Sequence, residues 1–148
     1  MPALIQLEGK MMDIDELKRR FVDQVKLRAY DDRYIDKQEE KELLKEAVGN
    51  GFTLDVAWST LVQVCDKEDY AMESVLDQKA REMLEQFAGN DGHIDKKEFD
   101  DAVAIISKAS KGRLGEPLCR KKAKDIILSS GWNVREGFMK GGHWFSQI

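Results

Sequence analysis

The chain has 148 residues, a length that suits one domain burying about two thirds of its unfolded surface. Apolar residues make up 42% and charged residues 35%, with only two prolines, which is typical of amphipathic helices with solvated outer faces. No apolar run approaches the ~20 residues of a membrane-spanning helix, and Ala3-Leu4-Ile5 is too short for the core of a secretion signal. We therefore expect a cytoplasmic protein without a transmembrane segment.

The first two predicted helices flank an acidic turn. Apolar residues at helical spacing predict an amphipathic helix over residues 14–29, begun by Asp13 or Asp15. Asp36 and Glu39 then form a capping box, in which each side chain accepts a hydrogen bond from the other residue's backbone N–H, so a second helix begins there. Its expected inner face consists of Leu43, Leu44, Ala47 and Val48.

The third predicted helix is the most apolar stretch of the chain, and we expect it at the centre of the core. Thr53 caps it. Its predicted inward residues are Leu54, Ala57, Trp58, Leu61, Val62 and Cys65. A fourth helix, over about residues 69–87, leads to a second acidic turn.

The second acidic turn is followed by two further predicted helices. Asp95 and Glu98 repeat the capping box and open the fifth helix. Pro117 suits the first position of the sixth helix, where its missing N–H would have no partner, and Gly131 ends that helix. The expected apolar contacts of the sixth helix are Leu118, Ala123, Ile126, Ile127 and Leu128.

An internal repeat organises this series of helices. Residues 32–39 and 91–98, which lie 59 positions apart, have nearly the same sequence, and each stretch stands between two helical segments. We therefore predict an all-α, single-domain bundle of about six or seven helices with a pseudo-twofold repeat of helix–acidic turn–helix units. Residues 1–131 would form the helical domain, and residues 132–148 an aromatic, glycine-rich tail that packs on it or extends from it.

The carboxylates of each turn either cap a helix or hold a cation. A 12-residue calcium loop needs oxygen ligands at positions 1, 3, 5, 7 and 9, glycine at 6 and glutamate at 12. Counted back from Glu98, the second turn supplies Asp91 and Gly92 at positions 5 and 6, but Phe87 and Gly89 at positions 1 and 3. The first turn fits less well, since it places arginines at positions 1 and 6. The pattern therefore favours capping over calcium binding in both turns.

These residues carry a resemblance to two families. The segment Asn90-Asp91-Gly92-His93-Ile94-Asp95-Lys96-Lys97-Glu98-Phe99 resembles the second half of an EF-hand loop with its exiting helix. It resembles more closely the Ala…Asp-Gly-x-Ile/Val…Glu pattern of TerB-like, tellurite-resistance helical domains. Residues 88–98 fit that pattern well, and residues 29–39 fit it with Arg33 in place of glycine. Paired EF-hand loops lie about 36 to 40 residues apart, so the spacing of 59 favours the TerB-like alternative.

The resemblance covers about residues 15–111 and implies a small acidic helical module. TerB-like domains are associated with stress responses and envelope-linked complexes, and carboxylates beside their Asp-Gly turns have been considered as metal sites. By position, the resemblance implies a weak site for Ca²⁺ or another divalent cation at the second turn, and a poorer one at the first. The candidate ligands are Asp91, Asp95 and Glu98 with Asn90, then Asp32, Asp36 and Glu39.

The end of the chain carries a basic and aromatic segment. Residues 1–110 contain 16 basic and 25 acidic side chains, whereas residues 111–148 contain 8 basic and 3 acidic ones. Basic residues interleaved with aromatic ones suit phosphate contact and base stacking, or docking onto a protein. The candidate residues are Arg120, Lys121, Lys122, Lys124, Trp132, Trp144 and Phe145. The alternative is that the basic residues form a solvated helix face and the aromatic ones cover the core.

Nothing in the chain points to an enzyme. The only histidines, His93 and His143, lack the spacing of a zinc site or of a nucleophile's base, and no glycine-rich phosphate loop follows a strand. Cys65 and Cys119 stand alone, which favours two reduced, structural thiols. We therefore predict a non-catalytic module that binds a protein partner and requires no cofactor. Binding to nucleic acid or a membrane surface through residues 111–148 is the alternative, and calcium sensing the third.

Overall fold

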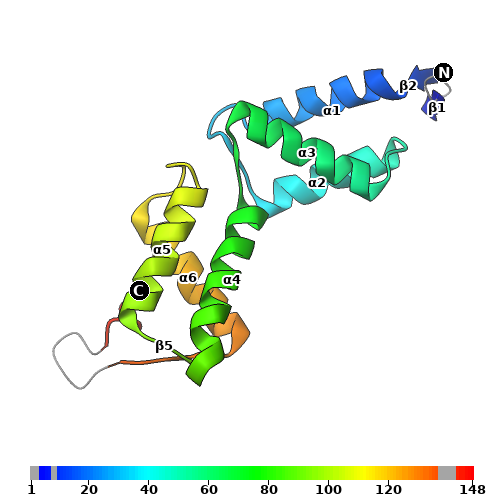
Figure 1. Ribbon diagram of the computed structural model, residues 1–148. Coiled ribbons are helices and arrows are strands. Elements are labelled where there is room, and N and C mark those ends of the chain that lie inside the picture. Colours follow the sequence, from blue (N-terminus) through cyan, green and yellow to red (C-terminus); the bar gives the residue numbers. More distant parts are fainter. Residues whose placement is uncertain (1–3, 8–9, 137–142) are drawn as a thin grey trace. The chain divides into compact units, whose positions relative to one another are not determined.

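The computed structural model describes residues 4–7, 10–136 and 143–148, with the backbone alone for residues 4–7, 10–12 and 90. Within these residues six helices and three short two-stranded ladders occur (Figure 1), so the prediction of an all-α protein is confirmed. The chain forms two compact units, Met1–Met72 and Glu73–Ile148. The division thus falls at Met72, whereas the sequence placed residues 1–131 in one domain and residues 132–148 in a tail.

The first unit consists of a hairpin, three helices and a short parallel ladder. Its elements are β1 (Leu4–Leu7), β2 (Lys10–Asp13), α1 (Ile14–Arg28), β3 (Tyr34–Ile35), α2 (Lys37–Gly49), α3 (Leu54–Glu68) and β4 (Ala71–Met72). β1 and β2 pair antiparallel, and this hairpin was not predicted from the sequence. β3 and β4 pair parallel, Tyr34 beside Ala71 and Ile35 beside Met72. The ladder therefore ties the turn after α1 to the end of α3.

The second unit repeats the order of helix, short strand, helix, helix and short strand. Its elements are α4 (Glu73–Asp91), β5 (His93–Ile94), α5 (Lys96–Ala109), α6 (Glu116–Ser130) and β6 (Asn133–Val134). β5 and β6 pair parallel, His93 beside Asn133 and Ile94 beside Val134. The order of elements after the hairpin is thus the same in both units, while a pseudo-twofold relation between them stays a prediction.

The predicted starts of α2, α3, α5 and α6 are confirmed, whereas α4 begins at Glu73 and not at about residue 69. The Asp36 and Asp95 side chains each accept a hydrogen bond from the backbone N–H three residues later, and both capping boxes are complete. Thr53 caps α3 in the same way, at 3.2 Å from the backbone N of Val56. Pro117 lies in the first turn of α6. These caps satisfy backbone N–H groups that have no partner inside the helix.

Each unit has its own apolar core. The first is built mainly by Leu17, Phe21, Val25, Ile35, Leu43, Ala57 and Leu61, and the second mainly by Leu76, Leu84, Ile94, Phe99, Ile106, Cys119 and Ile127. The predicted inner faces are wrong at five positions that are exposed instead: Val48, Leu54, Trp58, Leu118 and Leu128. Only one stripe of each helix turns toward the core of its own unit, and these side chains lie beside that stripe. None of the described helices combines the length and apolarity that crossing a membrane requires.

Candidate functional site

The first acidic turn is held by hydrogen bonds between its carboxylates and its own backbone. Asp32 Oδ1 accepts from the backbone N–H of Tyr34 at 3.1 Å. Asp36 Oδ1 accepts from the N–H of Glu39 at 2.7 Å, and Glu39 Oε1 accepts from the N–H of Asp36 at 3.2 Å. Arg33 adopts a left-handed conformation with φ 54°, which is costly for a residue with a side chain. Its guanidinium donates to the carbonyl oxygen of Glu68 at 2.7 Å.

The second acidic turn has the same pattern. Asp91 Oδ1 accepts from the N–H of His93 at 2.9 Å, and Asp95 and Glu98 exchange the two capping hydrogen bonds at 2.8 and 3.0 Å. Gly92 takes the left-handed position with φ 73°. The remaining oxygen of Asp91 forms an ion pair with Arg135, at 2.5 Å. The carboxylates of both turns are therefore oriented by helix caps and turn amides.

The candidate metal ligands do not converge on one point. Within the described residues, no group of three or more Asp, Glu, His or Cys side chains has the geometry to hold a metal ion. The side chain of Asn90 lies outside the described residues. The capping interpretation of Asp32, Asp36, Glu39, Asp91, Asp95 and Glu98 thus matches the observed hydrogen bonds. Weak cation binding stays a prediction.

Burial acts on one carboxylate of the first turn. The pKa of Glu39 is raised above its ordinary value of 4.5, first by burial and then by the nearby negative charges of Asp36 and Asp32, against the hydrogen bond from the Asp36 backbone. A raised carboxyl pKa means that ionised Glu39 is disfavoured in the folded unit. Stability from this group is therefore greatest at low pH and decreases as the pH rises through the raised pKa.

Each acidic turn pairs with a segment that the sequence did not single out. Met72 lies 37 positions after Ile35, and Val134 lies 40 positions after Ile94. Each of these partner segments follows the last helix of its own unit. A signal for the missed segments exists in the left-handed residues that end α3 and α6, Asp69 with φ 59° and Gly131 with φ 74°. Of these two residues, only Gly131 can be recognised from the sequence as the end of a helix.

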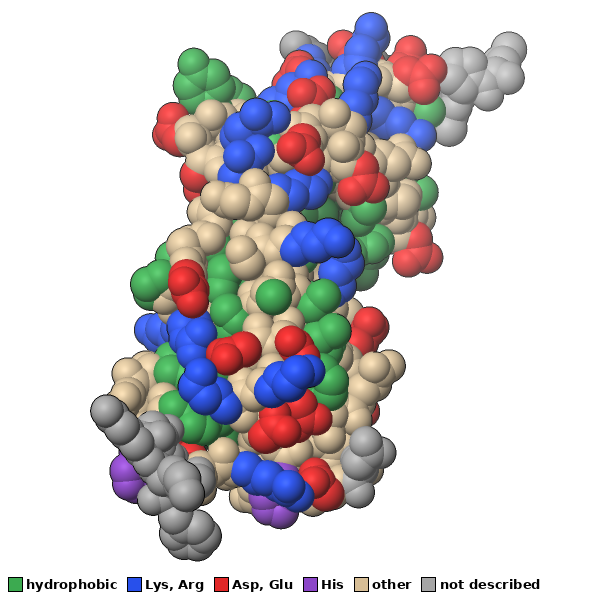
Figure 2. Space-filling view, turned by 60° about the vertical axis from the view of Figure 1, so that its left-hand side comes forward, with side chains coloured by type: hydrophobic (Ala, Val, Ile, Leu, Met, Phe, Trp, Pro, Cys, Tyr) green, Lys and Arg blue, Asp and Glu red, His purple; other side chains and the backbone are tan. Residues whose placement is uncertain are grey.

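The basic residues of α6 are engaged with partners in their own unit. Arg120 forms ion pairs with Asp100 and Glu116, at 3.3 and 3.5 Å, and its guanidinium lies over the Phe99 ring. Lys124 donates to the carbonyl oxygens of Phe145 and Ile148, each at 3.1 Å. On the face that Figure 2 shows, Lys and Arg side chains alternate with Asp and Glu side chains. Arg120 is therefore paired with carboxylates, and Lys124 is bonded to main-chain oxygens.

Lys122 is the most enclosed of these cations. It contacts Glu73 and Asp77, and its side chain is 20% exposed. Burial by itself lowers the pKa of Lys122, but the hydrogen bond to Glu73 and the charges of Asp77 and Glu73 outweigh it and raise that pKa above 10.5. Lys122 therefore stays charged at neutral pH and joins α6 to α4. Lys121 is exposed, and Trp132 is half-buried.

The tail aromatics lie in the core of the second unit. Trp144 and Phe145 are 8% and 9% exposed, so they do not form an exposed partner-binding surface. Their rings lie 5.0 and 6.0 Å from the Phe99 ring, measured between centroids. The indole N–H of Trp144 donates to the carbonyl oxygen of Arg135 at 3.2 Å. Trp144 and Phe145 therefore cover the core, as one of the two interpretations of the aromatic segment predicted.

The first unit exposes apolar side chains that sequence reasoning placed inside. Leu54 is 59% exposed and Trp58, one turn further along α3, is 38% exposed. Leu54 and Val48 line an open groove of about 460 Å³ between α2 and α3. The other lining residues are Glu40, Lys41, Leu44 and Lys45. An apolar floor with charged side chains at its edge is typical of a protein-binding surface.

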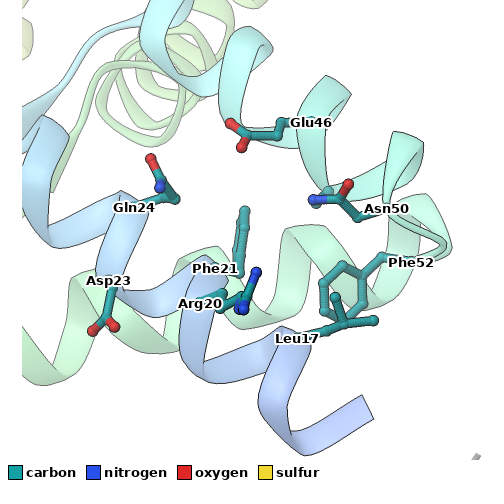
Figure 3. Close-up of a pocket in the computed structure, with 9 residues that line it drawn as sticks. Leu17, Arg20, Phe21, Asp23, Gln24, Glu46, Asn50 and Phe52 are labelled. Carbon is teal, nitrogen blue, oxygen red and sulfur yellow. The ribbon is translucent and has the colours of Figure 1, made fainter. Parts of the chain in front are cut away.

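A second hollow of the first unit lies between α1 and α2 (Figure 3). Phe21 and Phe52 form its apolar part, with ring centroids 6.0 Å apart. Gln24, Glu46 and Asn50 turn toward the space between the helices. Its volume is about 230 Å³, below the roughly 300–1,000 Å³ of most small-molecule sites. We therefore assign no ligand to it.

Comparison with known proteins gives no indication of function. No family model matches the chain, and neither a curated protein nor a solved structure matches it. The TerB-like and EF-hand-like resemblances therefore stay predictions.

Proposed function

We propose that the protein is a non-catalytic helical module that binds another protein through the first unit. The observation that carries this proposal is the groove between α2 and α3, which Val48 and Leu54 line with exposed side chains. Trp58, one turn further along α3 from Leu54, is also partly exposed. When a partner covers exposed apolar side chains, the free energy of binding becomes more favourable by roughly 25 cal/mol for each Å² removed from water. Tryptophan is also a frequent anchor of protein interfaces.

The alternatives receive less support from the described residues. Binding of nucleic acid through α6 would require cations available to phosphate groups, yet Arg120 and Lys122 are paired with carboxylates of their own unit. A calcium-responsive turn would have to give up the carboxylate hydrogen bonds that cap α2 and α5. Protein binding needs no such rearrangement.

A peptide selection on the full chain tests the proposal. Random peptides displayed on phage would be selected against the wild-type protein and then titrated against two variants, Leu54→Asp and Leu128→Asp. These leucines are equally exposed, at 59%, but Leu54 lines the groove and Leu128 lies on α6. We expect selected peptides to bind Leu54→Asp at least ~10-fold more weakly, with less than ~2-fold change for Leu128→Asp. Equal binding to both variants, or no enriched peptide, would refute the proposal.

A further inference from the structure

We propose that the face formed by α5 and α6 is a peptide-binding site that residues 143–148 of the same chain occupy, and that residues 143–148 of a second copy can take their place. The site lies on the second unit and binds a second copy of this chain, so the inference goes beyond the proposed function. Two aromatic rings and two main-chain oxygens hold the segment there.

The aromatic side chains of the segment fill the apolar part of this site. Trp144 and Phe145 are buried, and their ring centroids lie 5.0 and 6.0 Å from the centroid of Phe99 on α5. The indole N–H of Trp144 donates to the carbonyl oxygen of Arg135 at 3.2 Å. Aromatic pairs at such distances are favourable beyond the area that they bury. The face around Phe99 therefore recognises an aromatic pair.

A lysine of α6 recognises the main chain of the segment. Lys124 Nζ donates to the carbonyl oxygens of Phe145 and Ile148, each at 3.1 Å. It also lies 5.0 Å from the centroid of the Phe145 ring. Hydrogen bonds from a charged donor are stronger than those between neutral groups. Because every residue has a carbonyl oxygen, Lys124 fixes the path of the segment, and the two rings supply its specificity.

The segment is attached to the helices by these side-chain interactions and not by a strand ladder. Within the described residues, no ladder includes residues 143–148, and the backbone N–H of Ile148 donates to Phe145 of the same segment. Gln147 and Ile148 line an open hollow of about 330 Å³ beside Arg120, so the helix face extends beyond the part that the segment fills. The segment is thus bound as a separate peptide would be.

A second copy presents the same segment, so an exchange between copies leaves all of these contacts unchanged. The ratio of exchanged to closed molecules then depends on the concentration of the second copy relative to the effective concentration of the attached segment, which is on the order of millimolar for short connections. Exchange of an identical element between copies is a known way in which dimers form. We therefore expect closed molecules at micromolar concentration and exchange at millimolar concentration.

Nuclear magnetic resonance on the wild-type chain tests whether the segment can be replaced. An unlabelled peptide of residues 143–148, His-Trp-Phe-Ser-Gln-Ile, would be added to ¹⁵N-labelled protein at up to ~5 mM. We expect the indole N–H resonance of Trp144 to move toward that of an exposed indole, while the resonances of Trp58 and Trp132 stay unchanged. The same peptide with Trp144→Ala and Phe145→Ala should cause less than about a tenth of that change.

Variants of the full chain test the site itself. The acceptor variant carries Trp144→Ala and Phe145→Ala, so its own segment lacks both rings. Fluorescently labelled peptide should bind the acceptor at least ~10-fold more tightly than wild type, because the attached segment no longer competes. Adding Lys124→Met to the acceptor should weaken this binding by ~5-fold or more, whereas Lys121→Met, at an exposed lysine of the same helix, should change it less than ~2-fold.

Sedimentation of mixed full-length proteins tests the exchange between copies. The donor variant carries Lys124→Met, so it keeps both rings and lacks the lysine of its own site. Acceptor and donor mixed at about 0.5 mM each should form a heterodimer, whereas the acceptor alone should form no dimer at the same concentration.

Three results would overturn the inference. These are an unchanged Trp144 resonance at the highest peptide concentration, peptide binding that does not depend on Lys124, and a mixture without heterodimer. If circular dichroism shows that the acceptor has lost its helices, the resonance of wild-type Trp144 decides the question. The groove of the first unit takes no part in these measurements, so the proposed function stands or fails separately.

Discussion

In the second unit Trp144 and Phe145 pack on Phe99 of α5, whereas in the first unit an open groove lies between α2 and α3. Both units use the same order of helices, the same capping boxes and the same parallel ladder. This difference shows that helices in the same order can have their apolar side chains covered to unequal extents. It also predicts that equivalent substitutions have unequal consequences in the two units.

The largest expected difference is between two tryptophans. Trp144→Ala removes a buried ring from the second unit and should lower the free energy of unfolding by about 3 kcal/mol or more. Trp58→Ala removes a partly exposed ring from the first unit and should cost less than about 1 kcal/mol. Guanidinium denaturation followed by circular dichroism measures both. Similar losses would show that both faces are equally covered in solution.

The next difference is between two lysines that join helices. Lys122→Met leaves Glu73 and Asp77 without their enclosed cation and should cost about 2 kcal/mol in urea denaturation at pH 7. Lys26→Met breaks the more exposed α1–α3 pair with Glu68 and should cost less than about 0.5 kcal/mol. Because the pKa of Lys122 is raised, its contribution should persist up to its ordinary pKa of 10.5 and be lost as the pH rises through the raised value. A loss near neutral pH would contradict this.

The two left-handed turn residues provide a smaller contrast. Gly92→Ala forces a side chain into the left-handed region, with no steric contact within 4 Å, and should cost about 1 kcal/mol. Arg33→Gly relieves a similar cost but loses the hydrogen bond to Glu68, so its stability should stay within about 0.5 kcal/mol of wild type. Arg33→Ala, which keeps the strain and loses the bond, serves as the control and should be the less stable of the two Arg33 variants. Thermal unfolding ranks all three.

The smallest expected effect concerns Glu39. Glu39→Gln keeps an acceptor for the capping box and removes a charge that the fold disfavours, so at pH 7 it should be as stable as wild type or more stable by less than about 0.5 kcal/mol. This advantage should shrink as the pH falls toward the ordinary carboxyl value of 4.5, because wild-type Glu39 becomes protonated. Urea denaturation across this range measures the trend. An advantage that grows on acidification would exclude this cause.

Local features of the molecule were predictable from sequence, and long-range ones were not. The capping boxes at Asp36 and Asp95 depend on residues three positions apart, so their pattern suffices. The exposure of Leu54 and the burial of Trp144 depend on which distant segments pack on their helices. Helical periodicity does not identify those segments. The two-residue strands β4 and β6 are too short to produce an alternating pattern.

The candidate functional residues also differ in whether their contacts are local or distant in sequence. The acidic residues were recognised by their spacing, and their contacts with backbone N–H groups follow the predicted capping arrangement. The basic residues of α6 were recognised by composition, but their ion pairs with α4 and α5 could not be foreseen because those carboxylates are distant in sequence. The open groove was missed because Val48 and Leu54, which line it, fit the periodicity of a buried helix face.

Each unit contains one buried cysteine whose chemical modification can report local opening of that unit. Cys65 lies buried in α3 and Cys119 lies buried in α6, where burial raises the pKa of the thiol. A thiol reagent can modify either sulfur only when its surroundings open. The two labelling rates, resolved by peptide mass spectrometry, would therefore follow local opening of the two halves independently, in a single sample and without an introduced probe.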